Sequence, residues 1–360
     1  MDALYKKNTS EEYKVIKCID NKSIINFQIS HIRALIDGTF DLFKSIKNEN
    51  ILVFSNLEDF NNFSLIFYDI KLQQINTKVS KAHNDRIYTC RHFFDKITKS
   101  DLVITSSFDR WIKVWNVTNN YTLVYKKKPD YDFKENTYLL SENLLYYNQK
   151  NYLITSAYEI YSQGYEILFY SIDKTNDDIN NKKLTIENSK DNTNYLGVYY
   201  DNEIPYIISG NLGNIKVFDF SKKKLIKTFH DNFKQINYLS IVVKEDSNGK
   251  KKLIASSGDG ILRIWDYNEN KLISSIESGK EWIIGLCLLN EKYILASSAD
   301  GTIKQYDLDS NNLINSLKGN INIEEDMDII LCVKNINFDN KDYLVSHSNN
   351  GLIELWEKTK

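Results

Sequence analysis

The 360-residue sequence predicts an all-β chain built from repeated four-stranded units. A short apolar strand, a turn of small residues and a second strand ending in an aromatic residue recur seven times along it. Two of the turns contain Asp-Gly, at 259–260 and 300–301, which favours tight hairpins because these turns need positive φ angles. Another apolar strand precedes each hairpin and a looser one follows it, for example 283–289 and 271–276. Four strands per unit, repeated radially, predict a seven-bladed β-propeller of antiparallel blades.

The seven copies differ in how closely they follow this pattern. The clearest are 102–117, 253–267 and 294–308, and the weaker ones are 51–70, 152–172, 206–220 and 343–358. Their terminal aromatic residues are Tyr68, Trp115, Tyr170, Phe218, Trp265, Tyr306 and Trp356. The spacing of these residues falls in or a little above the ~40–45 residues of a four-stranded blade. We therefore expect one domain, residues 1–360, with blades at approximately 31–80, 81–126, 138–188, 195–229, 236–276, 283–317 and 329–358.

Polar residues at fixed places in the second copy resemble the WD-repeat (Trp-Asp repeat) β-propeller family. His83 precedes the innermost strand, Thr105 lies on the next strand, Asp109 in the hairpin and Trp115 at the end of the third strand. The resemblance implies that these four side chains hydrogen-bond one another and lock the blade.

The fifth and sixth copies carry parts of the same set. His230, Asp259 and Trp265 match it in the fifth copy, where Ala255 replaces the hydroxyl residue. Asp300 takes the place of the hairpin Asp in the sixth copy. The resemblance implies structural roles for these residues as well.

The seventh copy reaches the end of the sequence before a fourth strand. The resemblance implies that an N-terminal strand within residues 13–29 completes this blade and closes the ring. Closure would remove an exposed sheet edge, which otherwise invites aggregation.

Charge and composition exclude several classes of function. Lys plus Arg (46) nearly balances Asp plus Glu (48), so a net charge of −2 gives no global field for nucleic acid or anionic lipid. The sequence has no apolar run of ~18 residues that would span a membrane, and its N-terminus does not resemble a secretory signal. Four scattered cysteines fit reduced thiols better than a zinc site or disulfides. We expect a cytoplasmic protein, with association to the cilium or nucleus as alternatives.

Motifs that carry chemistry are missing from the sequence. It contains no phosphate-binding Gly-rich loop, HExxH zinc motif, EF-hand loop or GxSxG nucleophile elbow. We expect no catalytic residues, cofactor, metal or small-molecule substrate. One alternative stays open, a hydrolase-type enzyme whose carboxylates converge on the central channel after folding.

Binding of proteins or peptides is the function that the sequence favours. In the second copy Phe108, Arg110 and Trp111 flank Asp109 where smaller residues are usual, and aromatic and Arg side chains dominate interface energies. We expect Phe108 and Arg110 to be exposed, whereas Trp111 could equally pack against a neighbouring blade.

Residues at corresponding loop positions complete the predicted partner-binding set, which adds Arg86, Tyr88, Glu281 and Trp282. Trp282 could equally belong to the core. The sequence thus predicts a non-enzymatic scaffold within a multiprotein complex. A reader of a modified peptide, with Arg86 and Arg110 as charge partners, is a second alternative.

Overall fold

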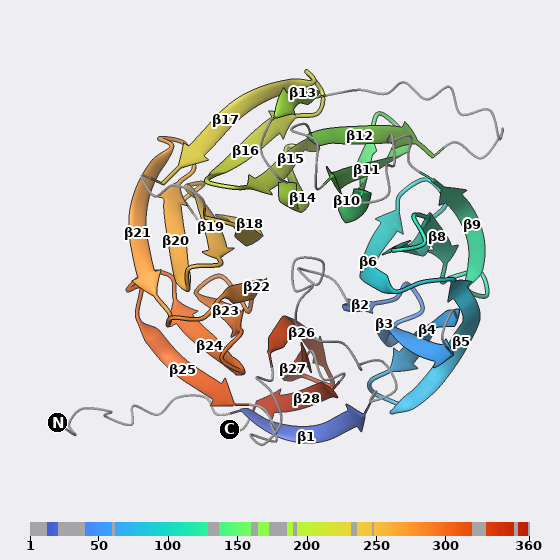
Figure 1. Ribbon diagram of the computed structural model, residues 1–360. Helices are drawn as coiled ribbons and strands as arrows, with labels where there is room; N and C mark the ends of the chain where they lie inside the picture. The colour runs from blue at the N-terminus through green and yellow to red at the C-terminus, as the bar shows by residue number, and fades with distance from the viewer. Residues whose placement is uncertain are drawn as a thin grey trace.

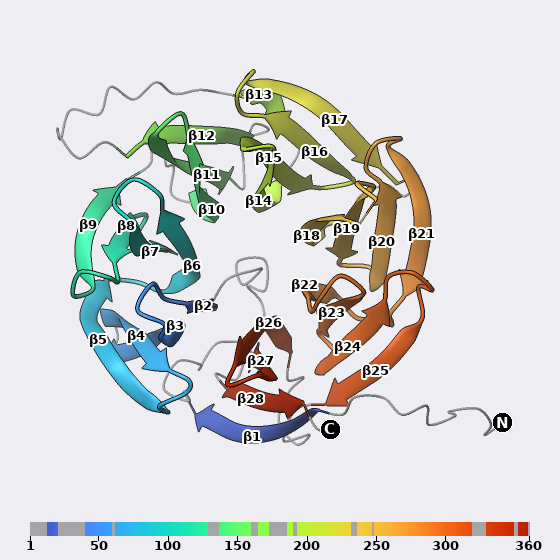
Figure 2. The same cartoon turned by 180° about the vertical axis from the view of Figure 1, so that it is seen from behind.

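A ring of seven β-sheets forms the molecule (Figures 1 and 2). The computed structural model describes residues 13–20, 40–59, 62–128, 137–159, 165–172, 186–189, 193–231, 236–246, 248–318, 329–348 and 352–358. Each sheet has four antiparallel strands, and neighbouring sheets follow one another around a central channel. The prediction of an all-β, seven-bladed propeller is confirmed.

The blades are numbered in chain order. Blade one contains β2 (Phe40–Lys44), β3 (Asn50–Asp59), β4 (Asn62–Asp69) and β5 (Gln74–His83). Blade two contains β6 (Ile87–Asp95), β7 (Ser100–Ser107), β8 (Ile112–Asn116) and β9 (Thr122–Lys127). Blade three contains β10 (Thr137–Tyr147), β11 (Lys150–Glu159), β12 (Tyr165–Ser171) and β13 (Ile186–Ser189). Blade four contains β14 (Thr193–Asp201), β15 (Ile204–Asn211), β16 (Asn214–Asp219) and β17 (Lys224–His230). Blade five contains β18 (Tyr238–Glu245), β19 (Lys251–Ser257), β20 (Ile261–Asp266) and β21 (Lys271–Glu277). Blade six contains β22 (Ile283–Leu288), β23 (Tyr293–Ser298), β24 (Thr302–Asp307) and β25 (Leu313–Lys318). Blade seven contains β26 (Ile330–Phe338), β27 (Lys341–Ser348), β28 (Leu352–Lys358) and, from the other end of the chain, β1 (Tyr13–Asp20).

The position of a strand within its blade decides its sequence pattern. The second strand of blade two, β7, is buried along its whole length because neighbouring blades cover both of its faces. The outermost strand of blade five, β21, lies at the rim of the ring (Figure 1) and alternates between exposed and half-buried residues. Continuous apolar and small residues therefore mark the inner strands, and alternation marks the rim.

Bulges recur at equivalent places in the blades. In blades two to seven, the pairing of the first and second strands shifts register near the start of the first strand, as between Ile87 and Thr89 or between Ile283 and Gly285. A bulge bends its strand and increases its twist. The repeated shift shows that the blades share one geometry even where their sequences diverge.

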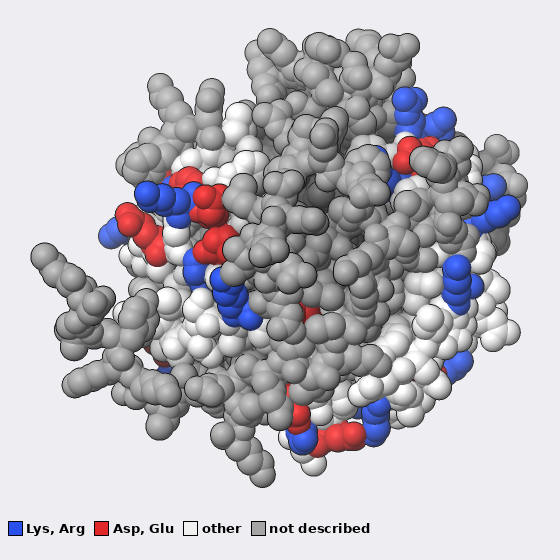
Figure 3. Space-filling model, turned by 60° about the horizontal axis from the view of Figure 1, so that its bottom comes forward, with Lys and Arg blue, Asp and Glu red and all other residues white. Residues whose placement is uncertain are grey.

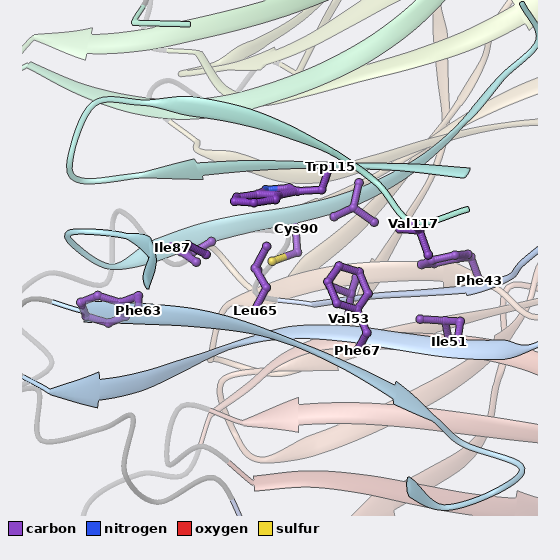
Figure 4. Close-up of a cluster of buried hydrophobic side chains, with 12 residues drawn as sticks. Phe43, Ile51, Val53, Phe63, Leu65, Phe67, Ile87, Cys90, Trp115 and Val117 are labelled. Atoms are coloured by element: carbon purple, nitrogen blue, oxygen red, sulfur yellow. The ribbon is translucent and has the colours of Figure 1, made fainter. Parts of the chain in front are cut away.

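The core is divided among the junctions between blades. Figure 4 shows the junction of blades one and two, where Phe43, Phe67 and Leu65 meet Cys90 and Trp115. All five side chains are buried. Each blade thus buries one face against the next, and its stability depends on its neighbour.

Asn residues occupy many of the tight turns. Asn48, Asn148, Asn202 and Asn340, which lie in turns between first and second strands, have φ angles between 48° and 62°. Asn tolerates this left-handed region better than most residues because its side chain can hydrogen-bond locally. The turn chemistry of this chain therefore relies on Asn as much as on Gly.

Strand β1 pairs with β28 at the outer edge of blade seven. The pairing is antiparallel and runs from Tyr13 opposite Lys358 to Asp20 opposite Leu352, with one shift between Val15 and Lys17. Residues from the two ends of the described chain thus share one sheet (Figure 1).

Candidate functional site

Four polar side chains meet where blade one joins blade two. His83 ends β5 of blade one, and its Nδ1 lies 2.9 Å from Asp109 Oδ2 in the β7–β8 hairpin of blade two. Its Nε2 lies 2.9 Å from Thr105 Oγ1, and Trp115 Nε1 donates to the same hydroxyl at 3.0 Å. The structure therefore brings together the four residues that the sequence analysis grouped, and their contacts connect two sheets.

The protonation of this network follows from burial. Burial lowers the pKa of His83, although the nearby Asp109 carboxylate opposes the shift. Burial alone would raise the pKa of Asp109, but hydrogen bonds from His83 and from backbone amides hold it below its ordinary value. A neutral His83 with Nδ1–H donating to Asp109 leaves Nε2 to accept the Thr105 hydroxyl proton, so every member has a partner.

Blade five uses a different lock from the one predicted. His230 is exposed, and the hairpin carboxylate of Asp259 accepts a 2.6 Å hydrogen bond from Arg263 Nη2. The Arg263 Nε also forms an ion pair with Asp231, the residue that follows β17 of blade four. The prediction that His230 holds this blade is wrong, because the fully buried Arg263 takes that place and reaches both carboxylates.

Trp265 of blade five is buried without the acceptor that Trp115 has. Ala255 stands where blade two has Thr105, and Trp265 Nε1 finds no hydrogen-bond partner among the described residues. A buried N–H without an acceptor costs about 1–3 kcal/mol. Compared with blade two, blade five thus has the two ion pairs of Arg263 but, within the described chain, lacks the hydrogen bond of the terminal indole N–H.

Blade six has a third version of the lock. Lys304 Nζ donates to Asp300 Oδ2 at 2.6 Å and to the Ser278 carbonyl oxygen at 2.5 Å. Tyr306 replaces Trp, and its hydroxyl donates to Ser278 Oγ at 2.6 Å. Asp300 thus holds a lysine in its own blade.

Sequence reasoning missed the cations of these locks. Lys113, Arg263 and Lys304 all stand two residues before the terminal aromatic of their strand. Lys113 Nζ likewise reaches back to the previous blade, where it donates to the Ala82 carbonyl oxygen at 2.5 Å. The signal in the sequence was a Lys or Arg at one position of an otherwise apolar strand.

The loops of blade two bring together most of the predicted partner-binding residues. The Phe108 amide donates to the Arg86 carbonyl oxygen at 2.9 Å, and the Arg86 guanidinium lies 5.9 Å from the centre of the Phe108 ring. Lys126 Nζ lies 5.5 Å from the centre of the Trp111 ring. We call Arg86, Phe108, Arg110 and Trp111 the blade-two loop cluster.

Members of this cluster are half-buried rather than fully exposed. Phe108 packs against the apolar residues between blades two and three, including Ile104 and Ile112, so the expectation that Phe108 is freely exposed is wrong. The Trp111 amide donates to Asp109 Oδ1 at 3.0 Å, which fixes the backbone beneath the ring. The cluster therefore presents aromatic edges and cations on a rigid support.

Arg110 occupies an unusual backbone position. Its φ angle is 68°, and the equivalent hairpin positions of blades five and six hold Gly260 (φ 76°) and Gly301 (φ 75°). A Cβ built on Gly260 would lie 2.3 Å from the Gly279 carbonyl oxygen. The left-handed conformation costs a residue with a Cβ about 1–2 kcal/mol. Blade two thus keeps a long cationic side chain where the hairpins of blades four, five and six use glycine, since Gly213 of blade four has a φ of 84°.

The remaining predicted residues lie apart from this cluster. Glu281 is exposed and Trp282 is half-buried in the loop before β22, which lies across the channel from blade two (Figure 2). Trp282 packs against the buried residues Ile284 and Leu331, so its role there is structural packing at least in part. The side chain of Tyr88 lies outside the described residues. The structure thus assembles only part of the predicted set into one surface.

A sequence comparison identifies the repeat. The WD domain, G-beta repeat family matches residues 223–266, which begin just before β17 of blade four and end with β20 of blade five. The match covers the outer strand of one blade and three strands of the next, with the Arg263 lock inside it.

The chain is a β-propeller that contains a WD repeat at residues 223–266.

Two proteins are similar to this propeller. Retinoblastoma-binding-like protein E of Dictyostelium discoideum is 35% identical over 66 residues, which are 18% of this chain and 12% of that protein. The crystal structure of Chaetomium thermophilum Raptor matches with a TM-score of 0.64 at 16% identity, covering 90% of this chain and 29% of that chain. The chain therefore spans less than a third of either protein, and the likeness to Raptor shows the fold alone.

The propeller encloses a cavity of about 260 Å³ in its channel, lined by residues from the first strand of every blade. Asp41 is the carboxylate among its described lining residues, and Asp41 Oδ2 accepts the His92 amide at 2.7 Å. Lys334 Nζ lies 3.9 Å from Asp41 Oδ1. The part of the wall that the structure describes therefore pairs its carboxylate with a cation and a backbone donor.

The described residues contain no group of three or more His, Cys, Asp or Glu residues placed to hold a metal ion. They also contain no helix of the length and apolar character needed to cross a bilayer.

Charge is unevenly distributed around the ring. Figure 3 shows mostly Lys and Arg on the side of the molecule that carries blades one and two, and both signs on the side of β20 and β21.

Proposed function

We propose that this propeller is a non-enzymatic subunit of a multiprotein complex and that it binds a partner protein through the blade-two loop cluster. WD-repeat propellers generally serve as scaffolds for protein interactions. The observation that carries the proposal is Arg110 at a φ of 68°, a conformation that glycine adopts more easily, in a hairpin that also carries the half-buried rings of Phe108 and Trp111.

The comparisons support this class of function without naming a partner. The name of the Dictyostelium discoideum relative refers to protein binding, and we extend only that class to this chain. Aromatic and Arg side chains on a rigid loop are the residues that most often dominate an interface.

The experiment uses the full chain purified by affinity from its own cells, with mass spectrometry to identify stoichiometric partners. Phe108→Ala with Arg110→Ala should weaken capture of such a partner about 30-fold, since hot-spot residues contribute about 2 kcal/mol or more. Arg110→Glu alone should also weaken capture of the partner, and this variant keeps the packed Phe108 ring.

Leu313→Ala with Lys318→Ala is a matched control, because both residues are exposed on β25 of blade six. Its capture should equal that of the wild type. Unchanged capture by the Phe108/Arg110 variant, with the same melting temperature as the wild type, would place the interface elsewhere. A chain that purifies alone and turns over a substrate would revive the hydrolase alternative.

A further inference from the structure

Exposed apolar residues and lysines are also unevenly distributed on the face opposite to the blade-two loop cluster. Antiparallel connection places all turns between first and second strands at one end of the blades, and the hairpins that carry Asp109 and Asp259 at the other. Apart from residue 247, the structure describes all seven turns between first and second strands, so they can be compared directly.

Blades one and two present apolar and basic side chains in these turns. Ile46 is 50% exposed, Ile97 is 51% exposed and Phe94 is 38% exposed. Exposed lysines flank them on both sides. We call these seven residues the lysine sector: Lys44, Ile46, Lys47, Phe94, Lys96, Ile97 and Lys99.

The lysines of this sector differ from those in the corresponding turns of blades five to seven. Lys250 lies 3.1 Å from Asp266, Lys292 lies 3.3 Å from Asp307, and Lys341 pairs with Glu357. Within the described chain, the four lysines of the sector form no ion pair with a carboxylate. Their charge is therefore available to an outside partner.

Hydrogen bonds hold the sector together as one surface. The Ile46 amide donates to Asp101 Oδ2 at 2.7 Å, which ties the turn of blade one to β7 of blade two. The Ile97 amide donates to Asp95 Oδ1 at 2.8 Å, and Asn151 of blade three donates to the same oxygen at 2.8 Å. Rigid turns lose little conformational entropy when they bind.

Aromatic residues extend this surface toward blades three and four. Lys96 Nζ lies 5.4 Å from the centre of the Tyr146 ring and 6.0 Å from that of Tyr200. The Tyr146 amide donates to the Tyr200 hydroxyl at 2.8 Å, and Tyr200 is 44% exposed. Aromatic side chains thus extend the surface of the lysine sector from blade two to blades three and four.

We propose that the lysine sector docks an acidic segment of a partner protein that also carries aliphatic or aromatic residues. Its carboxylates would meet Lys44, Lys47, Lys96 and Lys99, and its apolar side chains would cover Ile46 and Ile97. An anionic membrane fits less well, because a flat bilayer would also meet the exposed carboxylates of Glu203, Glu291 and Asp339 on the same face.

The test selects peptides of about 16 residues from a random display library against the immobilised full chain. Selected peptides should be rich in Asp and Glu with Leu, Ile or Phe between them. Lys96→Glu with Lys99→Glu should weaken their binding about tenfold or more, and Ile46→Ser with Ile97→Ser should do the same.

Two controls separate this proposal from the previous one. Lys271→Glu with Lys318→Glu makes the same charge change at exposed sites of blades five and six and should bind the peptides as the wild type does. Phe108→Ala with Arg110→Ala should also bind them normally, since that cluster lies on the other face.

Three results would overturn the proposal: no peptide selected, no acidic preference, or equal binding by the Lys96/Lys99 variant. Vesicles with about 30 mol% phosphatidylserine identify the competing occupant. If they bind the chain through Lys96 and Lys99 and acidic peptides do not compete, the sector is a membrane surface and the proposal is wrong.

Discussion

One added side-chain oxygen at position 255 should give the indole N–H of Trp265 the hydrogen-bond acceptor that it lacks among the described residues of blade five. Trp115 and Trp356 donate to Thr105 Oγ1 and Ser346 Oγ at 3.0 and 2.9 Å, whereas Trp265 faces Ala255. Ala255→Ser should supply the missing acceptor and raise the free energy of unfolding by about 1 kcal/mol. Urea unfolding of the two proteins measures this difference.

Blade six provides the matched control for this substitution. Ala296 is the equivalent of Ala255, but its aromatic partner Tyr306 already donates to Ser278 Oγ at 2.6 Å. Ala296→Ser should therefore bring no gain. Equal gains in both variants, or none in Ala255→Ser, would show that the unpaired indole N–H is not what limits blade five.

At the scale of the hairpin, the β7–β8 turn trades stability against the display of a side chain. Arg110→Gly should relieve the left-handed strain and raise the free energy of unfolding by about 0.5–1 kcal/mol, because the added freedom of glycine in the unfolded chain offsets part of the gain. The same change should weaken partner capture. Thermal and urea unfolding report the first effect, and the affinity experiment reports the second.

A substitution in the opposite direction, from glycine to a residue with a Cβ, at the equivalent position of blade five is the control. Gly260→Ala places a Cβ against the Gly279 carbonyl oxygen and should lower the free energy of unfolding by about 2 kcal/mol or more. If Arg110→Gly instead destabilises the protein, the φ of 68° is not strained and Arg110 is held there by contacts that matter for folding.

The sequence predicts those elements whose conformation is set by adjacent residues. The Asp259-Gly260 hairpin follows from two adjacent residues, because few dipeptides tolerate positive φ. The lock of blade five could not be predicted, since Arg263 and Asp231 are 32 residues apart and come together only when blades four and five pack. The sequence pointed to the correct loop but to His230 in place of its neighbour, because the direction of a side chain depends on the packed backbone.

The same argument explains the candidate surfaces. Phe108 and Arg110 stood out because they flank a recognisable hairpin. The lysine sector did not, because Ile46 and Ile97 are 51 residues apart and each looks like an ordinary turn residue. Only the ring places their turns side by side on one face.

At the scale of the whole molecule, the remaining question is how the ring is held closed. Strand β1 supplies the outer edge of blade seven, so blades one and seven are linked through the chain as well as through packing, where the Phe40 and His347 rings lie 6.0 Å apart. Deletion of residues 1–20 should leave the edge of β28 unpaired and lower the melting temperature by about 5 °C or more.

A synthetic peptide of residues 11–22 tests whether the strand itself is responsible. Added to the truncated chain, it should restore part of the lost stability in proportion to its concentration, because a ligand that binds only the folded state shifts the unfolding equilibrium. A scrambled peptide of the same composition should have no effect. An unchanged melting temperature after truncation would mean that β1 contributes no stability and that packing between blades one and seven holds the ring by itself.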